Sequence, residues 1–437
     1  MNRQKIIGGI DVGSSKTTTI IASAEEQEEG QARVLGVAWV PSKGIRKGQI
    51  VDIEEATQTV VESVEAAERM AGYNLNQAWV SIGGSHLASQ NSTGVVAVAE
   101  PEGEINIEDK ERVIEAARAV SLPSSREIIH VLPRFFTVDG QTGIKDPVSM
   151  SGVRLEVETH IITGSSTAIR NLNKSISEVG IKIQGLVASG LAAAESVLTE
   201  TEKELGVIVV DIGGGTINLL IYVEGAPFYA SVLPIGAKNV TSDLAIGLRL
   251  SLEAAEKIKI SLSAKEKKPA LPSGRPALPD NKEASETDEI SLAELGIVDE
   301  TKTVSRKTLV EGIIKPRLNE IFTMVGMEVK KSEAAGLTPA GVVICGGGAQ
   351  TVGILQAAKK TLAMPVRIGV PKGFSGLIDD IQTPDFAVAG GLILFGAKTE
   401  TKPVTGFSLG RFSKRLPKIP IKGTANKVWE LIKSFLP

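Results

Sequence analysis

Two short segments of the sequence share one pattern, although two hundred residues separate them. The first runs from Asp11 to Thr17 (DVGSSKT) and the second from Asp211 to Thr216 (DIGGGT). Each follows an apolar, β-branched run, starts with an acidic residue, passes through small residues and leads into a second β-branched run. Runs of this composition predict strands. Each segment is therefore predicted to be a strand–turn–strand hairpin, and a chain with two such hairpins can direct both turns at one ligand.

Tight turns of small residues favour binding of an anion, because backbone N–H groups can approach it closely. Hydroxyl and ammonium groups in the two turns would add donors. The predicted phosphate-binding residues are Gly13, Ser14, Ser15, Lys16, Thr17, Gly213, Gly214, Gly215 and Thr216.

Asp11 and Asp211 cannot face a phosphate directly, because like charges repel. They can hold Mg²⁺, which usually binds through water and bridges phosphates. We therefore predict that the hairpins clamp a triphosphate and its metal from both sides. The alternative is a pair of ordinary hairpins; one hairpin alone favours it, whereas a pair with matching acids does not. A Walker loop, G-x-x-x-x-G-K-[ST] leading into a helix, is absent from the sequence.

A third segment fits the same ligand. Val342–Cys345 predicts a buried strand, Gly346, Gly347 and Gly348 a turn, and Thr351–Leu362 a helix. Glycines allow close approach of the backbone, so a nucleoside could pack against this turn. The single cysteine, Cys345, is predicted to be a core residue.

Composition excludes several classes of function. An aromatic content of 4% and a net charge of −3 give no footprint for nucleic acid. One cysteine excludes a disulfide framework, and the three histidines lack metal-ligand spacing. No signal peptide and no apolar run of 18 residues is evident. The sequence therefore predicts a protein of the cytoplasm, and its 437 residues suggest about three structural units.

Strand-like and helical runs alternate along the chain, which predicts an α/β fold. Residues 86–163 interrupt this rhythm and are predicted to form an inserted α+β unit. Residues 265–289 hold four prolines among Lys, Glu and Ser, and predict a disordered surface loop. Residues 400–423 predict a basic flexible linker, and residues 424–437 a short terminal helix.

At this point the chain resembles a known family. Residues 128–134 (IIHVLPR), 149–156 (SMSGVRLE), 205–216 and 305–309 (SRKTL) carry the resemblance. The paired hairpins and the glycine turn resemble the actin-like ATPase superfamily, and these stretches resemble its FtsA family of bacterial cell-division proteins. The resemblance covers essentially the whole chain.

The resemblance implies a two-lobed actin-like ATPase fold with ATP between the lobes. The implied subdomains are residues 1–85, 164–205 and 371–399 for the core of the first lobe (1A), 86–163 for an inserted subdomain (1C), 206–239 and 316–370 for the core of the second lobe (2A), and 240–315 for subdomain 2B.

The resemblance also bears on nucleoside binding and on hydrolysis. It implies that Glu256 and Lys259 meet the ribose, although their i,i+3 spacing alone favours an ordinary solvated helix pair. Related ATPases orient the attacking water with Glu or Gln at a position where this chain has Ser189. We therefore expect slow hydrolysis at most, with ATP acting mainly as a structural ligand for polymerisation.

The resemblance implies several partners. The chain is expected to form filaments with itself, to help recruit later division proteins, and to bind the C-terminal tail of FtsZ on residues 240–315. Lys315 and Arg317, in a helix predicted over Arg306–Phe322, are candidates for that contact, although a solvated helix face is the favoured interpretation for each alone. The alternatives are a soluble sugar or acid kinase and a pilus-assembly homologue of the same fold.

The C-terminal segment predicts a membrane anchor. Residues 401–437 hold eight basic residues and one acidic residue, a net charge of +7. At 100° per residue, one face of the terminal helix, within about 160°, is apolar; it consists of Val428, Trp429, Leu431, Ile432, Phe435 and Leu436. Fourteen residues cannot span a bilayer, but this face and the basic linker suit an anionic lipid surface. The segment thus predicts a protein on the cytoplasmic face of the membrane, and the resemblance implies that it lies at the division septum. Docking on its own protein is the alternative.

Overall fold

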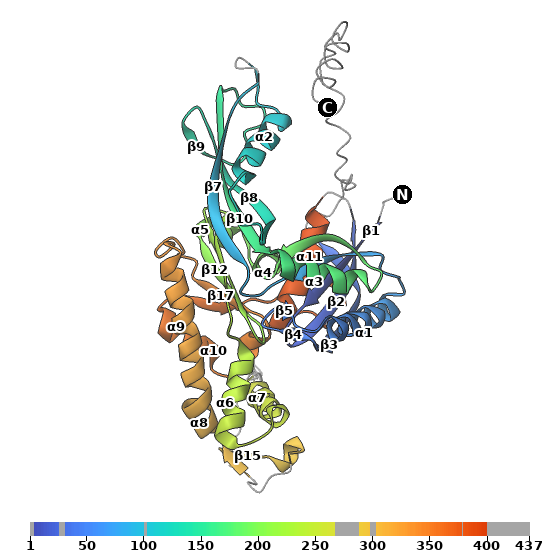
Figure 1. Ribbon diagram of the computed structural model, residues 1–437. Helices are drawn as coiled ribbons and strands as arrows, with labels where there is room; N and C mark the ends of the chain where they lie inside the picture. The colour runs from blue at the N-terminus through green and yellow to red at the C-terminus, as the bar shows by residue number, and fades with distance from the viewer. Residues whose placement is uncertain are drawn as a thin grey trace, which may run out of the picture. The chain divides into compact units, whose positions relative to one another are not determined.

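Two β-sheets of matching topology form the framework of the chain. In a computed structural model, which describes residues 4–25, 31–99, 103–266, 288–297, 303–377 and 379–399, the first sheet has the order β11-β6-β1-β2-β3-β19 and the second the order β18-β17-β12-β13-β14 (Figure 1). In each, an antiparallel meander (β1-β2-β3 or β12-β13-β14) is followed by two parallel strands beside its first strand. The internal repeat of the sequence is thus a repeat of topology.

The strands of the two sheets have the following bounds. The first sheet contains β1 (Gln4–Val12), β2 (Lys16–Glu25), β3 (Ala32–Pro41), β6 (Gln77–Ile82), β11 (Lys182–Ala188) and β19 (Phe374–Gly376). The second contains β12 (Val207–Ile212), β13 (Ile217–Val223), β14 (Ala226–Leu233), β17 (Val342–Cys345) and β18 (Val366–Ile368). Both predicted strand–turn–strand hairpins are confirmed.

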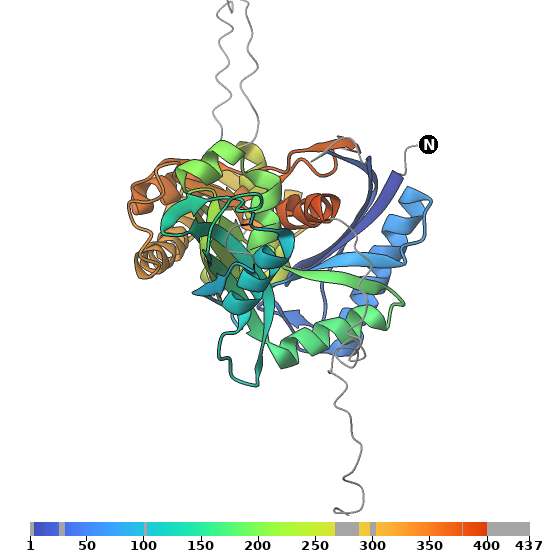
Figure 2. The same ribbon diagram turned by 90° about the horizontal axis from the view of Figure 1, so that it is seen from above.

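Helices cover both faces of both sheets. Between the sheets lie α4 (Ser189–Val197) and α11 (Ala387–Lys398), which share one apolar core with strands of each sheet. Figure 2 shows α11, in red, between the blue strands and the second sheet's side of the molecule. The outer face of the first sheet packs on α1 (Ile53–Ala71) and α3 (Ser166–Ser177). The outer face of the second packs on α6 (Ala237–Leu248), α7 (Leu252–Glu266), α9 (Lys315–Lys331) and α10 (Ile354–Leu362).

Strand β12 shows why this layering suits the sequence. Its side chains alternate between the two faces of the sheet. Val207 and Val209 enter the core shared with α4 and α11, whereas Ile208 and Val210 enter the outer core. A strand that is buried on both faces reads as a continuous apolar run, as this one does.

Residues 88–165 form a separate four-stranded sheet with its own apolar core. Its order is β7-β10-β8-β9, and α2 (Ile107–Arg118) packs on β7 and β10. The strands are β7 (Ala88–Ala97), β8 (Arg126–Val138), β9 (Gln141–Ile144) and β10 (Arg154–Ser165). The predicted α/β class with an inserted α+β unit is confirmed.

This inserted sheet contacts both lobes of the fold, that is, the part built on the first sheet and the part built on the second. The Ser89 hydroxyl on β7 donates to the Ala230 carbonyl of β14 (2.8 Å) and accepts from the Ala230 amide (3.0 Å). The guanidinium of Arg134 lies 4.7 Å from the ring centroid of Phe228. Toward the first lobe, the amide of Ala188 donates to Nε2 of His130 (3.1 Å).

Two predicted helices differ in detail from the structure. The helix predicted over Arg306–Phe322 is α8 (Arg306–Leu309), a π-helical turn (Val310–Ile314) and α9 in succession. The helix predicted from Thr351 begins only at Ile354, because the glycine turn continues as a 3₁₀ turn and Gly353 has a φ of 78°. The remaining elements are α5 (Glu200–Leu205), the pair β4 (Ile45–Arg46) and β5 (Gln49–Ile50), the pair β15 (Glu289–Ser291) and β16 (Thr303–Ser305), and 3₁₀ turns at Ala293–Leu295 and Pro384–Phe386.

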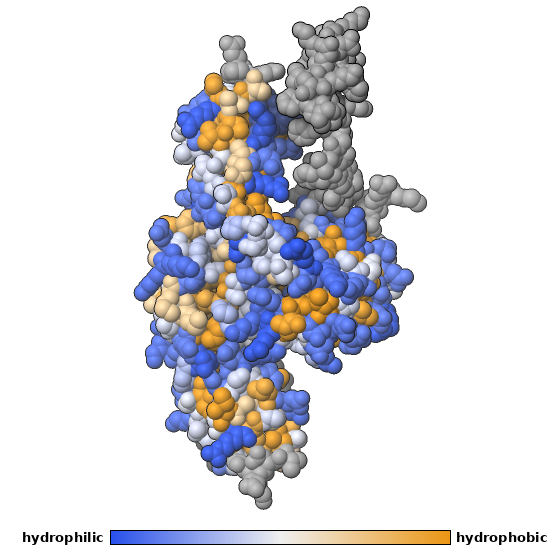
Figure 3. Space-filling model, in the orientation of Figure 1, coloured by the Kyte–Doolittle hydropathy of each residue, from blue (hydrophilic) through white to orange (hydrophobic). Residues whose placement is uncertain are grey.

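Several predictions fall outside the described residues. These are the basic linker 400–423, the terminal helix 424–437 and residues 267–287 of the predicted loop. Among the described helices, none combines the length and apolar character needed to cross a bilayer. On the face shown in Figure 3, hydrophobic residues form separate groups among polar ones.

The lowered pKa of His130 leads to a prediction about the stability of the protein at low pH. Burial lowers the pKa of this imidazole to about 4, whereas an unfolded histidine has a pKa of about 6.5. The unfolded state therefore takes up a proton first as the pH falls, and the folded state loses about 2 kcal/mol between pH 7.5 and pH 5 on this account. We expect His130→Gln to show a smaller loss of unfolding free energy over this range, measured by urea denaturation. An unchanged pH dependence in the variant would contradict this.

Candidate functional site

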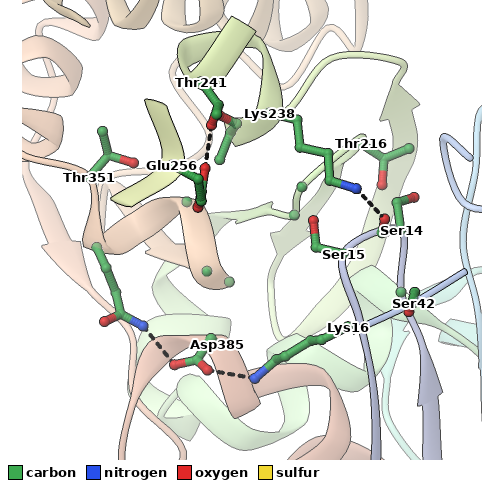
Figure 4. Close-up of a pocket in the computed structure, with 18 of the residues that line it drawn as sticks. Ser14, Ser15, Lys16, Ser42, Thr216, Lys238, Thr241, Glu256, Thr351 and Asp385 are labelled. Atoms are coloured by element: carbon green, nitrogen blue, oxygen red, sulfur yellow. Dashed lines mark hydrogen bonds and ion pairs between the residues drawn. The ribbon is translucent and has the colours of Figure 1, made fainter. Parts of the chain in front are cut away.

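Most of the predicted phosphate-, metal- and nucleoside-binding residues meet in one cleft between the two lobes. Its volume is about 1070 Å³. The turn after β1, the turn after β12, the glycine turn after β17 and helix α7 line it (Figure 4). Of the predicted phosphate-binding residues, Thr17 and Gly215 are not part of the lining. Thr17 is buried and its hydroxyl shares a hydrogen bond of 2.9 Å with Ser42.

The two hairpin turns have the same geometry and approach each other closely. The amide of Gly13 donates to the Lys16 carbonyl (3.2 Å), and the amide of Gly213 donates to the Thr216 carbonyl (2.9 Å). A side chain at Gly214 would collide with Ser15, and a Cβ at Gly215 would lie 3.2 Å from the hydroxyl of Ser14. Glycine at 214, and less strictly at 215, therefore allows the close approach of the opposite lobe.

The two acidic residues both line the cleft, close enough for the charge of Asp11 to act on Asp211. Asp211 is 4% exposed and accepts a hydrogen bond from Asn218 Nδ2 (2.7 Å), while Asp11 accepts one from the Ser81 hydroxyl (2.7 Å). Burial, together with the charge of Asp11, raises the pKa of Asp211 to about 7. Burial also raises the pKa of Asp11, against the opposing effects of Ser81 and Lys16. A cation beside these carboxylates would relieve this electrostatic cost.

These acids fit a hydrated cation better than a directly ligated one. Within the described ranges, no group of three or more His, Cys, Asp or Glu residues could hold a metal ion alone. Such an ion would take its remaining ligands from water or from a phosphate, as Mg²⁺ commonly does. Asn218 Oδ1 is buried without a hydrogen-bond partner and lies on the lining of the same cleft.

Lys16 lies in the cleft as predicted, but its charge is already compensated. Its ammonium lies 2.5 Å from Asp385 and 3.8 Å from the ring centroid of Phe386. The side chain of Gln350 donates to the other oxygen of Asp385 (2.6 Å). Burial tends to raise the pKa of Asp385, but the Lys16 ammonium and hydrogen bonds outweigh it and hold the pKa below its usual value. Sequence analysis missed Asp385, which follows no local motif.

Ser189 and Asn218 point to the same space beside the phosphate turns. A Cβ built at Gly83 would lie 3.0 Å from the Ser189 hydroxyl and 3.7 Å from Asn218 Oδ1. Both residues are buried and line the cleft. Neither is a strong base, so this position offers hydrogen bonds to water and no general base. Asn218 was not among the residues predicted from the sequence, although it lies only two positions after Thr216 of the second turn.

Glu256 and Lys259 form part of the cleft wall on α7. Their side chains make an ion pair of 2.7 Å, and both hydrogen-bond to the hydroxyl of Thr241 on α6 (2.5 and 2.9 Å). Lys259 is buried, so the pair is not an ordinary solvated one. The exposed apolar side chains of Leu252 and Ile260 line the same wall. Gly346, Gly347 and Gly348 line the cleft as predicted.

The two candidate partner residues lie outside the cleft and are paired within the chain. Lys315 is paired with Glu311. Arg317 binds both oxygens of Asp243 (2.5 and 2.8 Å) and one of Glu320 (2.5 Å). Arg317 therefore joins α9 to α6, and its charge is not free. The predicted membrane face, Val428 to Leu436, lies beyond the part of the chain that the structure describes.

Two family models match the chain. One, described as the SHS2 domain inserted in FTSA, matches residues 84–163, which include nearly all of the separate four-stranded sheet. The other, described as cell division protein FtsA, matches residues 208–391. The "Cell division protein FtsA" of Pseudomonas aeruginosa is 36% identical over 418 residues, which cover 95% of each chain. The chain belongs to the FtsA family.

Further FtsA relatives span similar lengths. The Escherichia coli K12 protein is 32% identical over 436 residues, covering 94% of this chain and 97% of its own. The Bacillus subtilis protein is 36% identical over 398 residues, covering 91% and 85%. The chain is therefore a cell-division protein, and the kinase alternative is not favoured.

Solved structures agree with the fold at low sequence identity. A chain of the "PilM-PilN type IV pilus biogenesis complex" matches with a TM-score of 0.60 and 17% identity, covering 90% of this chain and 99% of that one. The ethanolamine utilization protein EutJ from Carboxydothermus hydrogenoformans matches with a TM-score of 0.50 and 16% identity, covering 90% of each chain. These likenesses concern the fold alone, so the pilus-assembly alternative gains no support from them against the FtsA family.

Proposed function

We propose that this FtsA-family chain is an ATP-dependent polymer that tethers the FtsZ ring to the membrane and helps recruit later division proteins. The observation that carries the nucleotide part is the pair of facing hairpin turns, each with an aspartate at its base, Asp11 half-buried and Asp211 buried. The membrane part rests on the sequence of residues 401–437. The division role follows from the family.

ATP and Mg²⁺ are the ligands that the cleft fits best. Backbone amides and hydroxyls of both turns supply donors for phosphate oxygens. Asp11 and Asp211 would hold the hydrated metal, and the charge of Mg²⁺ would stabilise their ionised forms. The glycine turn and the wall with Glu256 and Lys259 leave room for the nucleoside.

We propose that ATP serves mainly as a structural ligand that closes the lobes and licenses polymerisation. Ser189 and Asn218 can hydrogen-bond a water molecule but cannot remove its proton efficiently. Hydrolysis at this site is therefore slow.

The partner surface is proposed on the subdomain around residues 240–315, where the C-terminal tail of FtsZ would dock. Lys315 is the better candidate contact, since its ion pair with Glu311 is on the surface. Charge reversal at Arg317 would also break its ion pair with Asp243. A loss of tail binding in that variant could therefore come from the broken pair and not from a lost contact with the tail.

The first prediction from the proposed function concerns the metal. We expect Asp211→Ala to weaken binding of ATP in the presence of Mg²⁺ at least 10-fold, because one of the two metal-facing carboxylates is lost. Affinity without Mg²⁺ should change little, and the exposed Asp380→Ala variant should behave as wild type. The measurement is a titration of nucleotide with and without Mg²⁺. Undiminished affinity of Asp211→Ala for ATP with Mg²⁺ would refute the two-hairpin site.

The second prediction concerns hydrolysis. Single-turnover and steady-state assays should give a rate far below the typical enzyme value of about 10 per second. Since Ser189 is a weak water ligand and not a base, Ser189→Ala should retain the residual rate within about tenfold. Complete loss of the rate in that variant, or a fast wild-type rate, would contradict the structural role of ATP.

The third prediction concerns the membrane. Deletion of residues 424–437, or Trp429→Glu on the apolar face, should abolish co-flotation with anionic liposomes while ATP binding survives. Ser434→Glu is the matched control, because it adds the same charge on the polar face and should weaken flotation much less. Flotation of the truncated chain at the wild-type level would exclude the tail as the anchor.

A further inference from the structure

One cation from the second lobe reaches across the cleft to the first lobe. Lys238 is the second residue of α6, and its ammonium donates to the main-chain carbonyl of Ser14 (2.7 Å), in the first hairpin turn (Figure 4). These two residues are 224 positions apart in the sequence. The contact therefore exists only when the two lobes adopt this arrangement.

The backbone of Lys238 is fixed on the second hairpin turn. Its amide donates to the Gly214 carbonyl (2.9 Å), and the amide of Ala237 donates to the Gly213 carbonyl (2.9 Å). A side chain at Gly236 would lie 2.6 Å from both of these carbonyl oxygens, so the chain can pass so close only with glycine there. The ammonium of Lys238 consequently lies between the two predicted phosphate turns.

The surroundings of the Lys238 ammonium differ from those of Lys16 and Lys259, which also line the cleft. Lys16 is paired with Asp385 and Lys259 with Glu256. Lys238 donates to a neutral carbonyl, and among the described residues no carboxylate lies within ion-pair distance of it. Partial burial of its ammonium lowers its pKa, opposed by the more distant charge of Glu256. An ammonium has three donors, and an anion in the cleft would be a better partner than a carbonyl.

We infer that Lys238 binds the terminal phosphate of the nucleotide and makes closure of the two lobes depend on that phosphate. This inference rests on the proposed nucleotide function. A triphosphate extends to both turns and meets the ammonium that joins them, whereas a diphosphate lacks the group that Lys238 would bind. Lys238 thus sets the preference for ATP over ADP.

The test compares three variants of the full-length chain by titration with ATP and with ADP in Mg²⁺. Lys238→Met keeps the length of the side chain and removes its charge. A lost hydrogen bond between charged groups should weaken ATP binding about 10- to 100-fold, while ADP binding should change less than threefold. Lys238→Arg should retain most of the preference for ATP. Lys360→Met, at an exposed lysine on α10 that is not part of the cleft lining, should change neither affinity.

The possible outcomes are distinct. Equal losses for ATP and ADP in Lys238→Met would overturn the inference and leave Lys238 as a lobe contact only. An unchanged ATP affinity in that variant would overturn it as well. Failure of the wild-type chain to bind either nucleotide would instead refute the proposed function. Urea denaturation without nucleotide should give Lys238→Met an unfolding midpoint close to wild type, and a folded variant with a lost ATP preference supports the inference.

Discussion

The close approach of the two hairpin turns across the cleft is the constraint on which the rest of the site depends. Glycines at 214 and 215 leave room for Ser15 and Ser14 of the opposite lobe. The shared core of α4 and α11 holds the two sheets so that the turns meet. The same arrangement brings Asp11 and Asp211 together away from solvent, which raises the pKa of both carboxyl groups. The folded chain thus retains an electrostatic cost that a bound cation would remove.

Three lysines of the cleft, Lys16, Lys259 and Lys238, are held in two different ways. Lys16 and Lys259 are held by carboxylates of the same chain, and these pairs fix the walls of the cleft. Lys238 instead joins the lobes through a neutral carbonyl. In the first two, a carboxylate already balances the charge of the ammonium, whereas the bond of Lys238 to a neutral carbonyl can be exchanged for a stronger one to phosphate. The cleft thus has walls that are held by internal ion pairs, and one contact between the lobes that an anion can replace.

The inserted sheet makes contacts that depend on how the two lobes are arranged. It contacts the second lobe through Ser89 and Arg134 and the first lobe through His130. A change in the angle between the lobes must therefore strain or release at least one of these contacts. Asn218, beside the phosphate turns, also lines a small, mostly apolar cavity whose walls include residues of β7 and β14.

The sequence by itself determined the elements and most of the site. Alternating and β-branched runs identified both hairpins, and their acids and glycines identified the cleft, because strand periodicity and turn chemistry are local properties. The start of α10 was misplaced because the glycine turn continues as a 3₁₀ turn. Only the tertiary structure decided which distant groups complete the site. Asp385, Asn218 and Lys238 follow no local pattern, and they reach the cleft because sheet order and helix packing bring their elements there. Arg317 likewise proved to be paired with Asp243 on a neighbouring helix, since partners across elements are set by packing and not by spacing.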